Sequence, residues 1–298
     1  MEIRRVLVVG TGTLGSQIGF QCALHGFETV MYDVDEGALE RCEAAHQKIG
    51  RAVRADLGTP GEAIAAAHVR LSYTTDLAGA AAEADLVSES VPEDPGLKRK
   101  VFAQLGEPCP SRTIFTTNSS TLLLSDMAEA SGRPERFLAL HFANQIWVNN
   151  VAEIMRHPGT DPEVFEQVVR FAREIGMVPI RLEKEQNGYV LNTLLVPLLG
   201  AALSLVVNGV ASHEDVDRTW MIAMKVPMGP FGTLDLVGLQ TAHDITAYWA
   251  SRSGDEQSRR NAAFLKEHYV DRGRLGVATG EGFYTYPDPA FRRPGFLD

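Results

Sequence analysis

The chain has few cysteines, and they follow no metal-binding pattern. Only Cys22, Cys42 and Cys109 occur in its 298 residues. An odd, widely spaced set excludes a disulfide framework and a CxxC zinc site, and no HExxH sequence or His/Cys cluster indicates another metal site. Such cysteines suit a reducing compartment, and MEIRRVLVVG lacks the apolar region and cleavage site of a signal peptide. We therefore predict a cytoplasmic protein without a bound metal.

Positive charge is also scarce. Lys and Arg total 28 against 38 Asp and Glu, so the net charge is −10. Nucleic-acid binding requires neutralisation of phosphates, and docking on an anionic membrane requires basic clusters. The charge balance therefore argues against both partners, and we expect a small-molecule substrate.

One long apolar run stands out, YVLNTLLVPLLGAALSLVVNGV at residues 189–210. It is long enough to cross a bilayer. However, it contains Asn192, Pro197 and Asn208, and no basic flank orients it. A helix that is apolar on all sides is equally suited to a protein core or a subunit interface, which is the location we predict.

Length and periodicity predict two domains. Residues 1–186 alternate short β-branched runs with helical patterns, which predicts a Rossmann-type, doubly wound, mainly parallel sheet. Pro179 cannot donate to a strand ladder, so the expected strand 178–182 should lie at an edge. Residues 187–298 predict an all-helical C-terminal domain. Other expected strands are 4–10, 28–33, 86–90, 113–118 and 137–142, and expected helical stretches are 13–25, 36–68 and 97–105.

A glycine-rich loop joins the first expected strand to the first expected helix. It matches GxGxxG, which is weak evidence alone but informative between a strand and a helix. The first glycine permits a tight turn, the second lets the backbone approach a pyrophosphate, and the third allows close packing. The helix N-terminus then offers N–H groups to the phosphates. The predicted contacts are Gly10, Gly12, Thr13, Leu14 and Gly15.

Asp33 ends the second expected strand, 18 residues after Gly15. A carboxylate there accepts hydrogen bonds from the ribose hydroxyls of NAD and repels the 2′-phosphate of NADP. Because no Arg follows directly to attract that phosphate, we predict NAD as the cofactor.

Four polar side chains are candidates for alcohol oxidation, which requires a base and hydrogen-bond donors for the reacting oxygen. His141 closes an apolar strand at the sheet edge where ligands bind, and Glu153 downstream is suited to orient it. Ser120 follows another strand, and Asn192 interrupts the apolar helix. Each residue alone is equally compatible with a structural role. We expect His157, in MRHPG, to be a solvated turn residue.

Eight segments, in order and spacing, resemble the 3-hydroxyacyl-CoA dehydrogenase family over nearly the whole chain. They are GTGTLGSQIG with Asp33, EDPGLK at 93–98, TIFTTNSST, LALHFAN, VAEIM, NGYVLN, PMGPFGTLDLVGL and GEGFYTY. The resemblance implies that Ser120, His141, Glu153 and Asn192 are catalytic. It also implies that Glu93, Lys98 and Asn118 contact the cofactor and that the substrate is an L-3-hydroxyacyl or 3-ketoacyl compound. The resemblance further implies that the helical domain contributes to substrate binding and forms a homodimer.

Several positions depart from the family pattern. HFANQ replaces the usual HFFNP and is followed by Trp147, which suits either a pocket wall or core packing. Gln186-Asn187-Gly188-Tyr189 replaces TPGF, and Val277-Ala278 replaces Arg-Lys. By an ungapped count, Ile49 and Asp56 replace the family's CoA-binding Ser and Lys, although Lys48, Arg51 and Arg54 lie close by in the sequence.

These departures leave the substrate open. An acid where a phosphate partner is expected weakens the prediction of a CoA thioester. HFAN, WVNN, NSSTLL and GMVPI resemble the diketoreductase-like branch, which reduces β-keto esters. A free 3-hydroxy acid of the carnitine or gulonate type is a further alternative, and a nucleotide-binding protein without catalysis is the alternative from another class.

Overall fold

The computed structural model describes residues 2–298. The chain divides into two compact units, Met1–Val190 and Leu191–Asp298.

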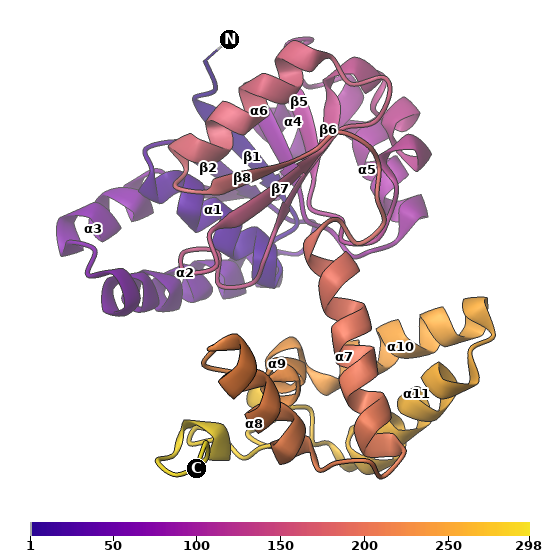
Figure 1. Cartoon of the computed structure of the whole chain (residues 1–298). Coiled ribbons are helices and arrows are strands. Elements are labelled where there is room, and N and C mark those ends of the chain that lie inside the picture. The colour runs from indigo at the N-terminus through magenta and orange to yellow at the C-terminus, as the bar shows by residue number, and fades with distance from the viewer. Residues whose placement is uncertain (1) are drawn as a thin grey trace. The chain divides into compact units, whose positions relative to one another are not determined.

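The first unit is built on one sheet of eight strands in the order β3-β2-β1-β4-β5-β6-β7-β8 (Figure 1). Every neighbouring pair is parallel except β6 and β7, which are antiparallel. The prediction of a doubly wound, mainly parallel sheet is thus confirmed, as is the edge position of the strand that contains Pro179. The strands are β1 Arg5–Val9, β2 Glu28–Tyr32, β3 Leu71–Thr74, β4 Leu86–Glu89, β5 Ile114–Thr117, β6 Phe137–Phe142, β7 Val151–Met155 and β8 Val178–Leu182.

Two strands were not among those expected. β3 has only four residues, and β7 coincides with the VAEIM motif. Residues 36–68, where helical stretches were expected, form two helices, because Gly58 adopts a φ of +68° and Pro60 follows.

Helices cover both faces of the sheet because alternate strand side chains point to opposite faces. In β1, Val6 and Val8 face one core, whereas Leu7 and Val9 face the other. The first core contains side chains of α1 (Thr13–Leu24), α2 (Glu36–Leu57), α3 (Gly61–Val69) and α6 (Pro162–Glu174). The second contains side chains of α4 (Leu77–Ala81), α5 (Pro95–Gly106) and the turns that follow β5.

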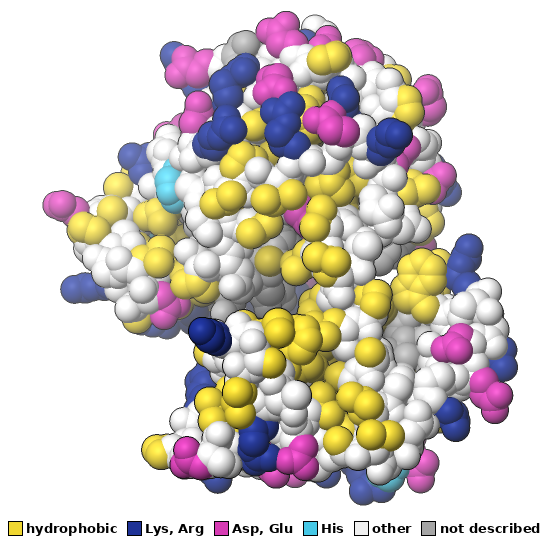
Figure 2. Space-filling view, in the orientation of Figure 1, with side chains coloured by type: hydrophobic (Ala, Val, Ile, Leu, Met, Phe, Trp, Pro, Cys, Tyr) yellow, Lys and Arg dark blue, Asp and Glu magenta, His cyan; other side chains and the backbone are white. Residues whose placement is uncertain are grey.

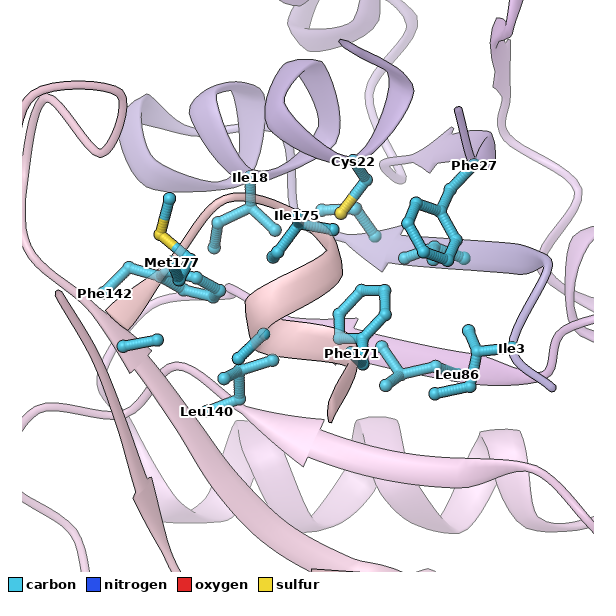
Figure 3. Close-up of a cluster of buried hydrophobic side chains, with 14 of the residues drawn as sticks. Ile3, Ile18, Cys22, Phe27, Leu86, Leu140, Phe142, Phe171, Ile175 and Met177 are labelled. Atoms are coloured by element: carbon cyan, nitrogen blue, oxygen red, sulfur yellow. The ribbon is translucent and has the colours of Figure 1, made fainter. Parts of the chain in front are cut away.

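Figure 3 shows buried side chains of the first core. Ile18 and Cys22 of α1 point toward Ile175, which ends α6. The rings of Phe27 and Phe171 meet edge to face with centroids 5.1 Å apart. This packing holds α1, and with it the glycine loop, against the sheet.

The second unit is helical, as predicted. Within residues 191–298, the β pairing is confined to isolated bridges around Glu281. The helices are α7 Leu191–Val207, α8 His213–Met224, α9 Pro230–Val237, α10 Leu239–Ser253 and α11 Glu256–His268.

Two buried carboxylates organise this unit. Asp217 accepts hydrogen bonds from the backbone N–H groups of Phe231 and Gly232 at the start of α9. Asp235 accepts from the backbone of Phe283 and Tyr284. The Asp217 bonds join α8 to α9, and the Asp235 bonds join PMGPFGTLDLVGL to GEGFYTY.

The helical unit also exposes large apolar side chains. In Figure 2, hydrophobic side chains gather on the visible face over its helices. In residues 2–298, no helix combines the length and apolar character needed to span a bilayer. The exposed apolar side chains include Leu194, Val210, Ile222, Met224, Tyr248 and Trp249.

The prediction for His157 is wrong. The residue is only 7% exposed. Its Nδ1 accepts from the Gly159 backbone N–H, and its Nε2 lies 2.9 Å from the Pro134 carbonyl oxygen. The local sequence resembled a turn, but the packing of distant residues buries the ring.

His46 is a fully buried ring that links three elements of the first unit. Its Nε2 lies 2.9 Å from the Ser16 carbonyl oxygen and therefore donates to it. Nδ1 then accepts from the Tyr73 hydroxyl at 2.7 Å. Burial lowers the pKa of His46 to about 4.

This burial predicts acid sensitivity. A histidine in the unfolded chain gains a proton below pH 6.5, whereas the folded ring resists protonation until about pH 4. The contribution of the neutral, buried His46 to the free energy of unfolding is therefore fully present above about pH 6.5. It decreases as the pH falls and is about 3 kcal/mol smaller at pH 4. Urea unfolding between pH 7 and pH 4 should show a shallower decrease for His46→Gln than for the parent. Identical pH dependence in both proteins would contradict this.

Candidate active site

A cleft lies where the strand order reverses, between the carboxyl ends of β1 and β4. Sheets of this kind bind ligands at that point. The cleft encloses about 640 Å³, and Gly10, Gly12, Asp33, Ser90 and Val91 are among its lining residues. The tight turn that leads into α1 requires glycine at Gly10, where φ is +96° and a Cβ would lie 2.7 Å from the Ser90 carbonyl oxygen.

The other two motif glycines serve different purposes. A Cβ on Gly15 would lie 2.0 Å from the Gly10 carbonyl oxygen, so Gly15 is required for packing of the loop itself. A Cβ on Gly12 would have no atom within 4 Å, so the protein leaves that space open. Gly12 immediately precedes α1, whose first N–H groups can receive phosphate oxygens there. Thr13 and Leu14 form the first turn of the same helix.

Asp33 lies just beyond β2 and lines the same cleft. Its Oδ2 accepts hydrogen bonds from the backbone N–H and the hydroxyl of Thr11, each at 2.9 Å. The carboxylate therefore holds the glycine loop in addition to bordering the predicted ribose position.

Lys98 belongs to a buried charge cluster. The side chain is 1% exposed, and Nζ lies 2.7 Å from Glu89 Oε1 and 3.5 Å from Glu93 Oε2. Burial raises the pKa of Glu89, although the Lys98 charge opposes that shift. The sequence analysis missed Glu89, and the only signal was an acid at the end of the apolar run LVSES.

Glu93 holds the turn that carries Ser120. Its Oε1 accepts from the Ser119 hydroxyl at 2.6 Å, from the Ser120 N–H at 2.9 Å and from the Thr121 N–H at 2.8 Å. Burial opposes ionisation of Glu93, but the Ser119 hydrogen bond, the Lys98 charge and the Thr121 bonds together lower its pKa. The structure thus connects Glu93 and Lys98 to Ser120, and their contacts with the cofactor stay predictions.

His141, Glu153 and Ser120 converge. The antiparallel pairing of β6 and β7 places His141 directly opposite Glu153. His141 Nδ1 lies 3.0 Å from Glu153 Oε2, and Nε2 lies 3.1 Å from Ser120 Oγ. The other carboxylate oxygen of Glu153 accepts from the Val190 N–H at 2.9 Å.

This geometry selects the histidine tautomer. An ionised Glu153 only accepts hydrogen bonds, so Nδ1 carries the proton and Nε2 presents its lone pair toward Ser120. His141 and Glu153 are 4% and 2% exposed, so the pair is shielded from water. The arrangement can remove a proton at Nε2 while the carboxylate stabilises the resulting imidazolium.

Two further predicted residues, Asn118 and Asn192, belong to different units of the fold. Asn118 is buried, and its Oδ1 accepts from the Phe142 N–H at 2.9 Å, which ties the end of β5 to β6. Asn192 is the second residue of α7 and belongs to the helical unit. Its convergence with Ser120, His141 and Glu153 therefore stays a prediction.

Trp147 joins the loop after β6 to the end of α2. Its indole Nε1 donates to Asp56 Oδ2 at 2.8 Å, and the ring packs against the first core. Gln17 of α1 holds the same loop through the N–H of Gln145 at 2.7 Å. The hydrogen bond to Asp56 and the core contacts of the ring therefore fix Trp147 between α2 and the loop after β6.

Comparisons with known proteins identify the family of the chain. Residues 5–186 match the 3-hydroxyacyl-CoA dehydrogenase NAD-binding domain, and residues 188–286 match the C-terminal domain of the same family. The chain belongs to the 3-hydroxyacyl-CoA dehydrogenase family. It is an enzyme with an NAD-binding domain, so the family resemblance and the cofactor prediction are confirmed.

Individual relatives cover nearly the whole chain. A probable 3-hydroxyacyl-CoA dehydrogenase of Caenorhabditis elegans is 33% identical over 96% of this chain and 96% of that protein. The human mitochondrial hydroxyacyl-coenzyme A dehydrogenase is 32% identical over 95% of this chain and 91% of that protein. A diketoreductase structure, described for dual catalysis of dicarbonyl compounds, is 50% identical with a TM-score of 0.90, over 96% of this chain and 100% of that one.

The alanine variants of Gly12 and Gly15 should behave in opposite ways. Gly12→Ala should leave thermal unfolding nearly unchanged, because the new methyl group meets no protein atom, but weaken NADH binding at least about tenfold. Gly15→Ala should lower the unfolding free energy by roughly 2 kcal/mol or more, because the methyl overlaps the Gly10 carbonyl. Calorimetry and NADH fluorescence titration measure the two quantities. Unchanged NADH affinity in Gly12→Ala would contradict the assignment.

Proposed function

We propose that this NAD-dependent oxidoreductase interconverts L-3-hydroxyacyl and 3-ketoacyl substrates by hydride transfer, with His141 and Glu153 as its acid–base pair. The observation that carries the proposal is the continuous chain of contacts from Glu153 through His141 to Ser120. Its position on β6 and β7 and the family membership together favour alcohol oxidation over a purely structural role.

The proposed mechanism assigns one task to each side chain. Nε2 of His141 removes the proton of the substrate 3-hydroxyl, and Glu153 stabilises the imidazolium. Ser120 and Asn192 hydrogen-bond the reacting or thioester-side oxygen. NAD, when bound, supplies the hydride acceptor, and in the reverse direction His141 returns the proton.

The cofactor fits the residues present. Gly12 leaves open space beside the N-terminus of α1, and Asp33 borders the same cleft. Gly10, Gly12, Gly15 and the first turn of α1 would hold the pyrophosphate, and Asp33 the ribose.

Removing either member of the pair tests the mechanism. His141→Gln and Glu153→Gln should lower kcat by about 10²–10⁴, the typical contribution of a general base. NADH affinity should stay nearly unchanged, because neither residue is among those that line the cleft at the glycine loop. His25→Gln, at an exposed position, serves as the matched control. Parental turnover in His141→Gln would refute the assignment.

A second candidate function is reduction of β-keto or diketo esters. The diketoreductase structure shares half of its residues with this chain. In addition, the resemblance implies a cationic phosphate partner at Asp56, and this acid instead accepts a hydrogen bond from Trp147. Both observations favour a substrate without the CoA nucleotide, and a free 3-hydroxy acid is the remaining alternative.

Charge at Asp56 discriminates these substrates. NADH consumption should be measured with acetoacetyl-CoA, a β-keto ester and free acetoacetate. We expect the ester to give the highest kcat/KM in the parent. Asp56→Lys should lower KM for acetoacetyl-CoA several-fold and leave the ester unaffected, because only the thioester carries phosphates. Asp56→Asn controls for loss of charge alone, and a parent that prefers acetoacetyl-CoA would contradict the second candidate.

We also propose that the enzyme is a cytoplasmic homodimer that associates through its helical unit. The exposed apolar side chains of that unit support association. The three cysteines are free and buried, which is compatible with a reducing compartment.

A further inference from the structure

Tyr189 lies flat against His141. The two ring centroids are 4.6 Å apart, and the ring planes differ by 16°. Tyr189 is 1% exposed, so its ring covers one face of the imidazole and excludes water from it. None of the roles assigned above uses this side chain.

The backbone at Tyr189 is held in an unusual conformation. Its φ is +54°, in the left-handed region that residues with a Cβ rarely adopt, and Gly188 before it has a φ of +76°. The next N–H group, that of Val190, donates to Glu153. Two consecutive residues thus contact both members of the acid–base pair, and strain of this kind is typical of functional sites.

The phenol itself is poorly suited to proton transfer. Burial raises the pKa of Tyr189, and the nearby carboxylates of Glu93, Glu153, Glu89 and Glu185 raise it further. The hydroxyl stays protonated at neutral pH, and the contact with His141 is made by the stacked ring.

We propose that Tyr189 is a positioning residue for His141, and this inference rests on the proposed function. The ring keeps the imidazole in the plane in which Nδ1 meets Glu153 and Nε2 meets Ser120. When His141 takes a proton, its positive charge lies over the electron-rich face of the Tyr189 ring, in a cation–π arrangement. Tyr189 therefore acts on catalysis through His141, without contact with the substrate.

Variants at Tyr189 separate the ring from its bulk and its hydroxyl. Tyr189→Phe keeps the stack and should retain kcat within about threefold of the parent. Tyr189→Leu keeps buried apolar bulk but removes the stack, and kcat should fall at least about tenfold, because small displacements of a catalytic group are costly. KM and NADH affinity should change less than about threefold in both variants. A phenylalanine variant as impaired as the leucine variant would assign the effect to the hydroxyl and overturn the proposal.

A double-mutant cycle with His141→Gln identifies the route of the effect. If Tyr189 acts through His141, Tyr189→Leu should cause no further loss of turnover in the His141→Gln background. An equal loss in both backgrounds would overturn the positioning role. If His141→Gln alone retains parental turnover, the proposed function itself fails. If that variant is inactive and Tyr189→Leu is fully active, only the present inference fails.

The rate of chemical modification of His141 tests the proposal without relying on turnover. Modification of His141 by diethylpyrocarbonate, quantified by peptide mass spectrometry, should be at least about fivefold faster in Tyr189→Leu than in the parent or Tyr189→Phe. If the leucine variant does not fold, Tyr189→Gly replaces it, because glycine adopts a positive φ without strain. Unchanged modification rates in the folded ring-deleted variant would contradict shielding and positioning of His141 by Tyr189.

Discussion

The antiparallel pairing of β6 with β7 is the constraint on which the candidate site depends. It is the one antiparallel junction among the paired strands of residues 2–298, and its register sets His141 opposite Glu153. A register shift of one residue would send Glu153 to the other face of the sheet. Burial on both sides resists such a shift, so the packing of the sheet also fixes the position of His141 relative to Glu153. Ser120 then contacts Nε2 of His141, and the Val190 N–H donates to the second carboxylate oxygen of Glu153.

A second set of polar contacts, at the ends of β4 and β5, holds the turn that carries Ser120. Glu89 and Lys98 form a buried ion pair at the end of β4, and Glu93 extends it to the backbone around Ser120. Removing one partner of a buried pair leaves an uncompensated charge, so the members of this cluster depend on one another. On the cofactor side, Asp33 and Thr11 hold the glycine loop in a similar way. Loops that must be placed accurately are thus fixed by charged hydrogen bonds and not by hydrophobic packing alone.

Much of the first unit was predictable because its signals are local. The strand, the GxGxxG turn and the helix follow one another between Arg5 and Leu24, and each depends on nearest-neighbour geometry. β7 was missed because five residues with a polar Glu153 at their centre resemble a half-buried loop until β6 and β8 enclose them. His157 was misjudged for the same reason, since a turn-like sequence carries no information about distant residues that cover it.

The residue order by itself determined the fold class, the cofactor loop and the identity of the candidate side chains, because periodicity and motif spacing are encoded over short stretches of chain. Only the tertiary structure decided that Nδ1 of His141 faces Glu153, that Nε2 faces Ser120, that Lys98 is buried between two carboxylates and that Tyr189 covers the imidazole. These contacts join residues from separate strands and loops. Their distances depend on strand register and on burial in a shared core, which no local segment specifies.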